Sequence, residues 1–271
     1  MSKSYFQFKQ FIIHQDRCAM KVCTDACILG AWIAGGRERA EARVRADGQR
    51  DRGDGHPWSR ALDIGSGTGL LMLMLAQKNG GSIQGIELDS VAFGQLQENI
   101  AQSKWKDRLG VVAGDAKDFV SPTKFDLIIS NPPFFEGDLP AASHAGNLAK
   151  HSKELTLAEL IRVIDVNLGE MGSFGILLPW HRVHYFEELA AGSGFYWREK
   201  LLVRQGPKHD FFRAVLHFSR GRKDEVSPGV ARVDGVPEAG GATVTELTIK
   251  DDAGNYTEEF VGLMKDYYLY L

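Results

Sequence analysis

The chain has 271 residues, of which 44% are hydrophobic and 25% are charged, and its formal net charge is -3. This length and apolar content suffice for a packed core, and we expect residues 1–271 to form a single domain. The slightly acidic balance argues against avid, sequence-independent binding to duplex DNA, but it leaves room for a local cationic patch that binds RNA.

The cysteine content and the N-terminus indicate the compartment. The three cysteines contain no Cys-x-x-Cys pair, which favours a reducing environment over a disulfide framework and indicates no zinc site. Residues 1–14 lack the apolar core of a signal peptide, and the longest apolar stretch, 70–76, is far too short to span a membrane. We therefore expect a cytoplasmic protein with no membrane association and no bound metal.

Short apolar runs alternate with amphipathic segments along the chain. The sequence predicts strands at 61–64, 82–88, 109–113, 125–130, 174–178, 199–204 and 211–218, and helices at 69–78, 90–103, 156–168, 186–191 and 258–271. This alternation is typical of a doubly wound α/β fold with a mostly parallel sheet. Because no helix separates the last two strands, they predict an antiparallel hairpin at one edge.

Two stretches interrupt the alternation. Residues 35–57 and 221–242 are rich in glycine and charged side chains and carry few large apolar ones. We expect both to be surface loops, and we expect 35–57 to be a flexible insertion. The acids and arginines of 35–57 nearly balance, which favours a solvated loop over a nucleic-acid-binding arm.

A glycine-rich segment follows the first predicted strand, where Asp63 precedes Gly65, Gly67 and Gly69. Glycine tolerates positive φ angles and lets the backbone approach a ligand closely. The Gly-x-Gly-x-Gly spacing differs from the dinucleotide fingerprint, and no Lys-Ser/Thr pair follows, so a phosphate-cradling loop is excluded. The segment instead favours S-adenosylmethionine, a nucleoside cofactor without phosphates.

Acidic side chains stand at the ends of three successive predicted strands. We expect Glu87 to accept hydrogen bonds from the ribose hydroxyls, and Asp63 to order the loop or to meet the methionine ammonium group. Asp115, followed by Ala116, stands where the adenine amino group needs an acceptor. Each acid alone could be an ordinary surface residue, but ligands of open α/β sheets bind at the edge where all three end.

Asn131, Pro132, Pro133 and Phe134 follow the strand at 125–130. An exocyclic or amide nitrogen is a weak nucleophile because its lone pair is delocalised, so a catalyst must accept both N–H hydrogens and aim the lone pair at a methyl group. Asn131 Oδ1 and the Pro132 carbonyl are two such acceptors, held by a proline-stiffened loop, and Phe134 can stack on a planar base. Asn-Pro alone favours a turn, but together with the glycine loop it predicts methyl transfer to nitrogen.

These motifs, in this order, resemble the class I (Rossmann-like) S-adenosylmethionine-dependent amino-methyltransferases, which implies a seven-stranded sheet. Residues 8–11, 16–22, 24–25, 29–32 and 255–258 resemble more specifically the bacterial valine-tRNA adenine-N6 methyltransferase family. That family modifies the adenine immediately 3′ of the anticodon, at tRNA position 37.

The resemblance implies that residues 1–34 cap the cofactor and substrate site, with Thr24 and Asp25 closing it, and that Asn131 also borders the cofactor. Cys23 stands where the family has glycine, and Phe134 stands where related enzymes often have tyrosine. Stacking on a base survives the second change, whereas a hydroxyl contact is lost.

The sequence therefore predicts an S-adenosylmethionine-dependent tRNA (adenine-N6)-methyltransferase that acts as a monomer. Its expected phosphate contacts are basic side chains: Lys9, Arg17, Lys21, Lys208 and Arg213, with Arg198, Lys200 and Arg204 as further candidates. The alternatives are an enzyme acting on rRNA guanine N2 or a protein glutamine amide, and a non-catalytic RNA-binding relative. A DNA adenine methyltransferase would need a sizeable target-recognition region, and a glutamine-directed enzyme a helical domain ahead of the core; the sequence shows neither.

Overall fold

The structure is a computed structural model that describes residues 4–18, 20–36, 58–133, 155–221 and 242–271, with the backbone alone of 232–233 and 236–237. Most of the two predicted loops, 35–57 and 221–242, lies outside the described residues, as does Phe134. Within the second loop, β10 (Arg232–Val233) and β11 (Val236–Pro237) pair as a short antiparallel ladder.

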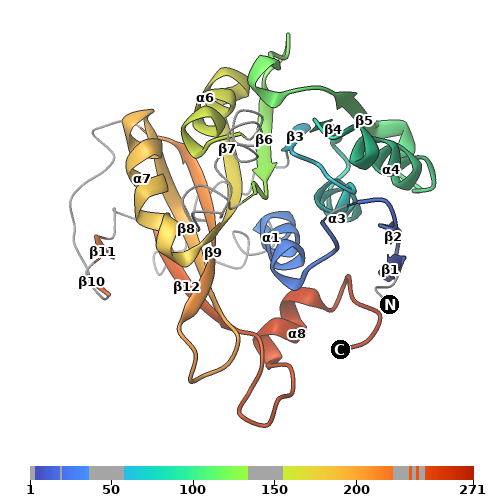
Figure 1. Ribbon diagram of the computed structural model, residues 1–271. Helices are drawn as coiled ribbons and strands as arrows, with labels where there is room; N and C mark the ends of the chain where they lie inside the picture. The colour runs from blue at the N-terminus through green and yellow to red at the C-terminus, as the bar shows by residue number, and fades with distance from the viewer. Residues whose placement is uncertain are drawn as a thin grey trace, which may run out of the picture.

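One eight-stranded sheet organises the described chain (Figure 1). In spatial order its strands are β12 (Thr243–Thr248), β8 (Phe195–Arg204), β9 (Phe211–Arg220), β7 (Leu168–Pro179), β6 (Phe125–Ser130), β3 (Arg60–Ile64), β4 (Ser82–Glu87) and β5 (Leu109–Ala113). In this sheet β9 runs antiparallel to both neighbours and all the other pairings are parallel. The predicted α/β class with a mostly parallel sheet is confirmed.

The direction in which strands are added reverses between β3 and β6. From β3 the chain moves outward to β4 and β5, and it then returns to the other side of β3 to form β6 and β7. In open α/β sheets such a reversal leaves a crevice at the carboxyl ends of the strands, where ligands bind. The topology therefore singles out the ends of β3 and β6, at Ile64 and Ser130.

The far edge of the sheet differs from the prediction. The antiparallel hairpin β8–β9 is present, but β9 lies between β7 and β8, and β12 forms an eighth strand beyond β8. β12 pairs in parallel with β8 over its whole length. It covers backbone groups that β8 would otherwise expose at the edge.

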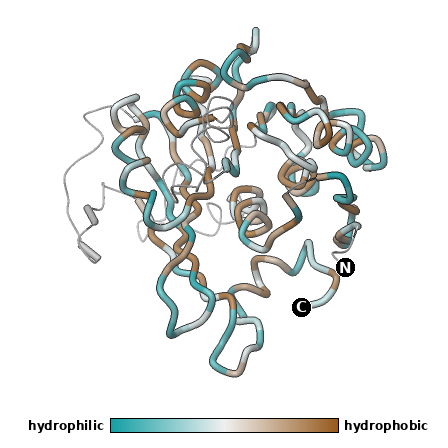
Figure 2. The backbone as a smooth tube through the Cα atoms, viewed as in Figure 1, coloured by the Kyte–Doolittle hydropathy of each residue, from teal (hydrophilic) through white to brown (hydrophobic). Residues whose placement is uncertain are grey.

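Helices cover both faces of the sheet (Figure 1). One hydrophobic cluster includes residues of four helices, α1 (Thr24–Ala34), α3 (Leu70–Lys78), α4 (Ser90–Ala101) and α8 (Glu258–Met264). The cluster on the opposite face includes residues of α6 (Leu157–Asn167) and α7 (Val183–Gly192). Hydrophobic residues follow the strands and α1 in Figure 2, as expected for a sheet that is buried on both faces.

Helix α1 is one that the periodicity of the sequence does not predict. Eight of its 11 residues are buried, so it has no polar stripe from which a helical period could be recognised. It packs closely on α3, since a Cβ atom at Gly30 would lie 2.6 Å from Met74 Sδ. This packing fixes the position of Thr24 and Asp25, which form the first turn of the helix.

The residues before α1 form a small hairpin that lies against α4. Its strands are β1 (Tyr5–Gln7) and β2 (Ile12–His14). The buried Asn99 side chain accepts a hydrogen bond from His14 N at 3.0 Å and donates to the His14 carbonyl at 2.9 Å. Its amide also donates to the Thr68 carbonyl at 2.9 Å. A single α4 side chain thus ties the N-terminal hairpin to the glycine-rich loop.

The C-terminal helix is shorter than its apolar spacing predicts. α8 begins after Thr257, whose Oγ1 accepts a hydrogen bond from Phe260 N at 3.2 Å, and it ends at Met264. Tyr267 is buried beyond the helix end, and its hydroxyl donates to the Met74 carbonyl at 3.2 Å. Across the described ranges, no helix combines the length and the apolar content that crossing a membrane requires.

Candidate active site

The glycine-rich segment and the Asn-Pro-Pro segment leave adjacent strands at the same edge of the sheet. β3 and β6 pair in parallel with Ile64 opposite Ser130, and Ser130 Oγ donates a hydrogen bond to the Ile64 carbonyl at 2.9 Å. Because neighbouring strands lie about 4.8 Å apart, the next residues, Gly65 and Asn131, emerge side by side. The two segments therefore meet where the strand order reverses.

The three glycines of the loop have different structural roles. Gly65, Gly67 and Gly69 have φ angles of 73°, 54° and 85°, which favour glycine. A Cβ atom at Gly65 or Gly67 would meet no described heavy atom within 4 Å, so both border open space. A Cβ atom at Gly69 would lie 2.7 Å from Leu96 Cδ1. Gly69, which the sequence predicts to bind the cofactor, is the N-cap of α3 and lets α4 pack closely.

Asp63 lies just before this loop with 0% of its surface exposed. Neither of its carboxylate oxygens has a hydrogen-bond partner in the described part of the chain. Burial, and to a smaller extent the negative charge of Glu87, raises the pKa of Asp63 to about 8. A buried carboxyl group without a protein partner is costly to the fold and typical of functional sites. It suits a ligand that carries a positive charge.

The raised pKa of Asp63 predicts a specific dependence of stability on pH. As pH rises from about 4 to about 8, Asp63 ionises in the unfolded chain before it ionises in the folded protein, so the free energy of unfolding falls across this window. Asp63→Asn removes that contribution, and each pKa unit corresponds to about 1.4 kcal/mol. Without cofactor, we expect the variant to melt at a higher temperature than the parent at pH 7.5, with a smaller gap at pH 5.

Thermal melts between pH 4.5 and 8.5 measure this difference. Asp107→Asn is a suitable control, because Asp107 is an exposed acid on the short 3-10 helix Lys106–Arg108. Parallel melting profiles for Asp63→Asn and the parent protein would show that the Asp63 carboxyl group titrates normally.

Glu87 supports the glycine-rich loop from the end of β4. Its Oε2 accepts a hydrogen bond from Gly67 N at 2.8 Å, and its Oε1 accepts one from Asp89 N at 2.8 Å. Each carboxylate oxygen can accept a second hydrogen bond, so ligand hydroxyls can still bind. Glu87 is thus both a part of the loop and a strand-end acceptor.

Asp115 follows β5, the next strand along the sheet. Its Oδ1 accepts a hydrogen bond from Lys117 N at 2.9 Å and caps the short helix Ala116–Asp118. Its Oδ2 lies 3.4 Å from Lys117 Nζ. The fold brings the acids at the ends of β3, β4 and β5 to one edge, although Asp115 is partly committed to its own turn.

Asn131 has an acceptor atom that no described protein donor satisfies. Its Oδ1 is buried and has no hydrogen-bond partner among the described residues. Pro132 is buried and Pro133 is exposed, so one proline anchors the segment while the next faces outward. A buried amide oxygen left unpaired costs free energy unless a ligand donates to it. The geometry therefore provides a prepared acceptor beside the glycine-rich loop.

Thr24 and Asp25 lie farther along the same edge. Asp25 Oδ2 forms an ion pair with Arg213 Nε at 2.9 Å, and Arg213 pairs with Pro179 at the carboxyl end of β7. Asp25 Oδ1 also accepts a hydrogen bond from Ala26 N at 3.0 Å. Arg213, predicted to bind RNA, therefore connects β9 to the start of α1.

The other predicted RNA contacts are also engaged within the protein. Each has an acidic or carbonyl partner: Arg17 pairs with Glu98, Lys208 with Asp252, Lys9 with the Lys265 carbonyl and Lys21 with the Gln15 carbonyl. Arg17, Lys9 and Lys208 are exposed. Exposed ion pairs contribute little to stability, so Arg17 and Lys208 can exchange their acidic partners for a phosphate at small cost.

Lys200 was a wrong candidate for RNA contact. Lys200 is 3% exposed and forms an ion pair with Glu187, and its Nζ atom lies 3.8 Å from the ring centroid of Trp197. Burial lowers the pKa of Lys200, and the Glu187 carboxylate opposes this effect. The other two candidates bind neighbouring strands, because Arg198 Nε donates to Ser219 Oγ at 2.7 Å and Arg204 Nε to Thr248 Oγ1 at 2.8 Å.

Ser130 and Asn99 position the site, although sequence reasoning does not identify them. Ser130 ends an apolar strand, and its hydroxyl fixes the register of β6 against β3. Asn99 interrupts the apolar stripe of α4 and is 1% exposed. A lone amide on a buried helix face is the feature that could have revealed it, because buried amides need partners. In the part of the chain that the structure describes, no three His, Cys, Asp or Glu side chains gather as metal ligands.

The fold and the site together define a class of protein. Residues 55–165 match the family model described as the methyltransferase small domain. The fold is similar to that of a protein from Agrobacterium tumefaciens described as a predicted O-methyltransferase, with a TM-score of 0.59 and 15% sequence identity over 90% of this chain and 96% of the other. The chain is thus a methyltransferase with the class I, Rossmann-like fold.

Whole-chain relatives narrow the class to a family. A Dyadobacter fermentans protein is 40% identical over 80% of this chain and 82% of its own. Relatives from Bacteroides thetaiotaomicron and Escherichia coli O157:H7 are each 34% identical, with 100% of this chain and 100% and 97% of their own covered. All three are named tRNA1(Val) (adenine(37)-N6)-methyltransferase. The chain belongs to this family, which confirms the resemblance.

Proposed function

We propose that this protein transfers a methyl group from S-adenosylmethionine to the exocyclic N6 of the adenine 3′ of the anticodon in valine tRNA. One observation carries the proposal: the buried Asn131 Oδ1, which has no hydrogen-bond partner among the described residues, stands beside the glycine-rich loop at the reversal point of the sheet. The names of the whole-chain relatives support the tRNA substrate. The site of action is the cytoplasm, and the acting form is a monomer.

Asn131 and Pro132 act on the amino group of the target base. The free N6 lone pair is delocalised into the purine ring, so N6 needs two acceptors that draw its hydrogens out of the ring plane. Asn131 Oδ1 and the Pro132 carbonyl accept these hydrogens, and Phe134 stacks on the base. Because Pro132 and Pro133 hold the backbone, the acceptors need no reorganisation during the reaction. S-adenosylmethionine supplies an electrophilic methyl group bonded to a positively charged sulfur.

The acids at the strand ends hold the methyl donor. The open backbone at Gly65 and Gly67 admits the ligand, Glu87 accepts from the ribose hydroxyls, and Asp115 with Ala116 borders the adenine. Asp63 is buried, and its carboxylate oxygens have no hydrogen-bond partner within the described ranges, which supports its assignment to the cationic methionine end. The buried Asp63 carboxylate, without a partner among the described residues, and the open backbone at Gly65 and Gly67 are therefore chemically suited to S-adenosylmethionine.

The N-terminal segment and the exposed cations bind the RNA. Residues 1–34 cap the site, since the β1–β2 hairpin is tied through Asn99 to the glycine-rich loop. Thr24 and Asp25 close its other side. Lys9, Arg17 and Lys208 meet phosphates, whereas Arg213 acts by holding Asp25. An anticodon loop presents its bases unpaired, so turning one into the site costs little.

The alternatives receive less support. An enzyme directed at guanine N2 or a glutamine amide would use the same acceptors, but the whole-chain relatives carry the adenine-N6 name. A non-catalytic RNA-binding relative would have no need of a buried amide oxygen at the reversal point that no described residue satisfies.

Incubation with methyl-labelled S-adenosylmethionine and total tRNA tests the proposal. The tRNA comes from a strain that lacks the family enzyme, and the labelled tRNA is then digested to nucleosides. We expect the label in N6-methyladenosine, and in valine tRNA when isoacceptors are separated first. Label in N2-methylguanosine, or no incorporation by folded protein, would overturn the proposal.

A further inference from the structure

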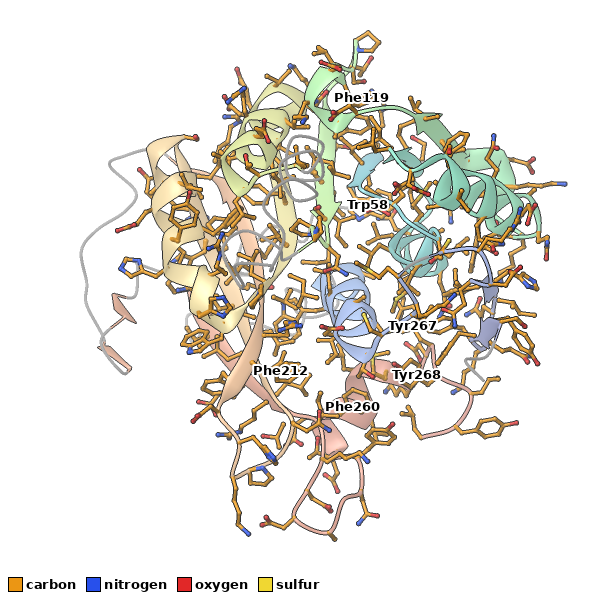
Figure 3. The ribbon with its side chains drawn as sticks, viewed as in Figure 1. Trp58, Phe119, Phe212, Phe260, Tyr267 and Tyr268 are labelled. Atoms are coloured by element: carbon orange, nitrogen blue, oxygen red, sulfur yellow. The ribbon has the colours of Figure 1, made fainter. Side chains whose placement is uncertain are left out.

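A cavity of about 290 Å³ lies beside the first turn of α1. Its lining includes Asp25, Gln205, Phe212, Lys250 and Tyr256. Phe212 is labelled in Figure 3, where it lies near Phe260 of α8. Ligand pockets measure about 300–1,000 Å³, so this cavity is at the small end of the range and suits a single flat ring system.

The cavity lies at the same edge of the sheet as Asn131. Phe212 belongs to β9, which is two strands from β6, and Gln205 follows β8, which is three strands away. Neighbouring strands lie about 4.8 Å apart and residues along a strand about 3.3 Å apart. Ser130 pairs with Ile176 and Arg213 with Pro179, so Phe212 and Gln205 lie beyond Asn131 along the strands as well as across them, which places the cavity roughly 15–20 Å from Asn131. A nucleotide two or three positions from the target base in an extended loop spans that distance.

The walls of the cavity carry the groups that recognise an unpaired base. The Tyr256 ring is 42% exposed and stacks on Phe260 with centroids 4.7 Å apart. Lys250 Nζ lies 5.5 Å from the Tyr256 ring centroid. Gln205 is an exposed amide that can donate and accept at a base edge. Proteins bind single-stranded RNA by stacking bases on aromatic rings and reading their edges with such polar groups.

The wall formed by Gln205, Lys250 and Tyr256 is held in place without help from the Tyr256 side chain. Lys250 N donates to the Gln205 carbonyl at 3.0 Å, and Asp251 N donates to the Asn255 carbonyl at 2.9 Å. Thr257 Oγ1 closes the base of the loop by donating to the Thr248 carbonyl at 2.6 Å. The recognition surface is therefore preformed, and shortening Tyr256 leaves its backbone supported.

We propose that this cavity binds a second, unpaired nucleobase of the RNA loop, two or three nucleotides from the target adenine. Tyr256 stacks on that base, Gln205 bonds to its edge, and Lys250 meets the adjoining phosphate. The inference rests on the proposed function and extends it, because two bases held at a fixed spacing would select one loop from many that contain an adenine.

The test uses the full-length protein and a synthetic anticodon stem–loop with the target adenine. A series of stem–loops carries a single abasic site at each loop position within three nucleotides of that adenine. The variants are Tyr256→Ala and Tyr256→Phe, with Tyr185→Ala as the matched control. Tyr185 is 45% exposed on α7 and, like Tyr256, has a cation near its ring, with Arg182 Cζ 5.3 Å from the ring centroid.

We expect Tyr256→Ala to raise KM for the intact loop about tenfold, in line with the loss of one base–aromatic stack. Values of kcat and of Kd for S-adenosylmethionine stay unchanged, and Tyr256→Phe keeps the parent KM. For the parent protein, we expect one of the abasic loops to raise KM by the same factor as Tyr256→Ala does on the intact loop. On that abasic loop, Tyr256→Ala raises KM no further.

Two outcomes separate this proposal from the proposed function. Suppose that the parent methylates the loop. If Tyr256→Ala then has the same KM as Tyr185→Ala, the cavity does not bind a base. The same conclusion holds if Tyr256→Ala raises KM by the same factor on every abasic loop as on the intact loop. If the parent transfers no methyl group to adenine N6 in any loop, the proposed function fails as well.

Discussion

Replacing Asn131 with alanine is expected to lower kcat for methyl transfer to tRNA by about 10²–10³, the usual cost of removing one preorganised hydrogen-bonding group from a reacting centre. The change removes one of two oxygen acceptors that draw the hydrogens of the target amino group out of the ring plane. Cofactor affinity is expected to stay nearly constant. Single-turnover methylation of tRNA and calorimetry with S-adenosylmethionine measure the two quantities separately.

The state of Asn131 in the structure sharpens this prediction. Because Oδ1 has no partner among the described residues, its removal should leave the melting temperature unchanged or slightly higher. Asn131→Asp is the matched variant, since it keeps an acceptor at the same place, and we expect it to retain more activity than the alanine variant. Equal kcat for Asn131→Ala and the parent protein would remove Asn131 from the reaction.

Replacing Glu87 with alanine is expected to weaken binding of S-adenosylmethionine by about 100-fold. Hydrogen bonds to charged groups contribute about 1.5–3 kcal/mol each, and about 1.4 kcal/mol corresponds to a tenfold change in Kd. The variant loses the acceptors that we propose for the ribose hydroxyls and also the two hydrogen bonds from Gly67 N and Asp89 N that hold the loop. Calorimetric titration of the cofactor measures the effect directly.

Two further variants separate the roles of Glu87. Glu87→Gln keeps one accepting oxygen, so an intermediate Kd is expected. Glu98→Ala removes an exposed acid of α4 that pairs with Arg17, and it should leave Kd unchanged. If Glu87→Ala binds the cofactor as tightly as Glu98→Ala does, the ribose lies elsewhere.

The centre of the sheet could be predicted from sequence because β3 and β6 are largely buried. The predicted strands at 61–64 and 125–130 coincide within one residue with these two strands, since near-continuous apolar runs are typical of strands covered on both faces. The prediction at 109–113 also coincides with β5, although β5 is a mostly exposed edge strand. The sequence also predicts that the glycine-rich loop and Asn131 lie at the same edge of the sheet, since each segment follows a predicted parallel strand.

The sequence could not reveal which side chains depend on distant partners. Asp25 and Arg213 are separated by 188 positions, so the local sequence does not show that they form an ion pair or that Arg213 already has an acidic partner. Lys200 resembles any surface lysine until Glu187 is folded beside it. Likewise, the local sequence does not show that Leu96 lies close to Gly69, the contact that distinguishes Gly69 from Gly65 and Gly67. Local patterns identify the elements, and tertiary packing assigns the roles.

A crystal structure of the protein with S-adenosylhomocysteine and the anticodon stem–loop tests the central claim most directly. We predict that the target adenine lies beside Gly65, with its N6 within about 3.2 Å of both Asn131 Oδ1 and the Pro132 carbonyl. An adenine whose N6 bonds to other groups, or an Asn131 side chain that points away from the base, would contradict the account.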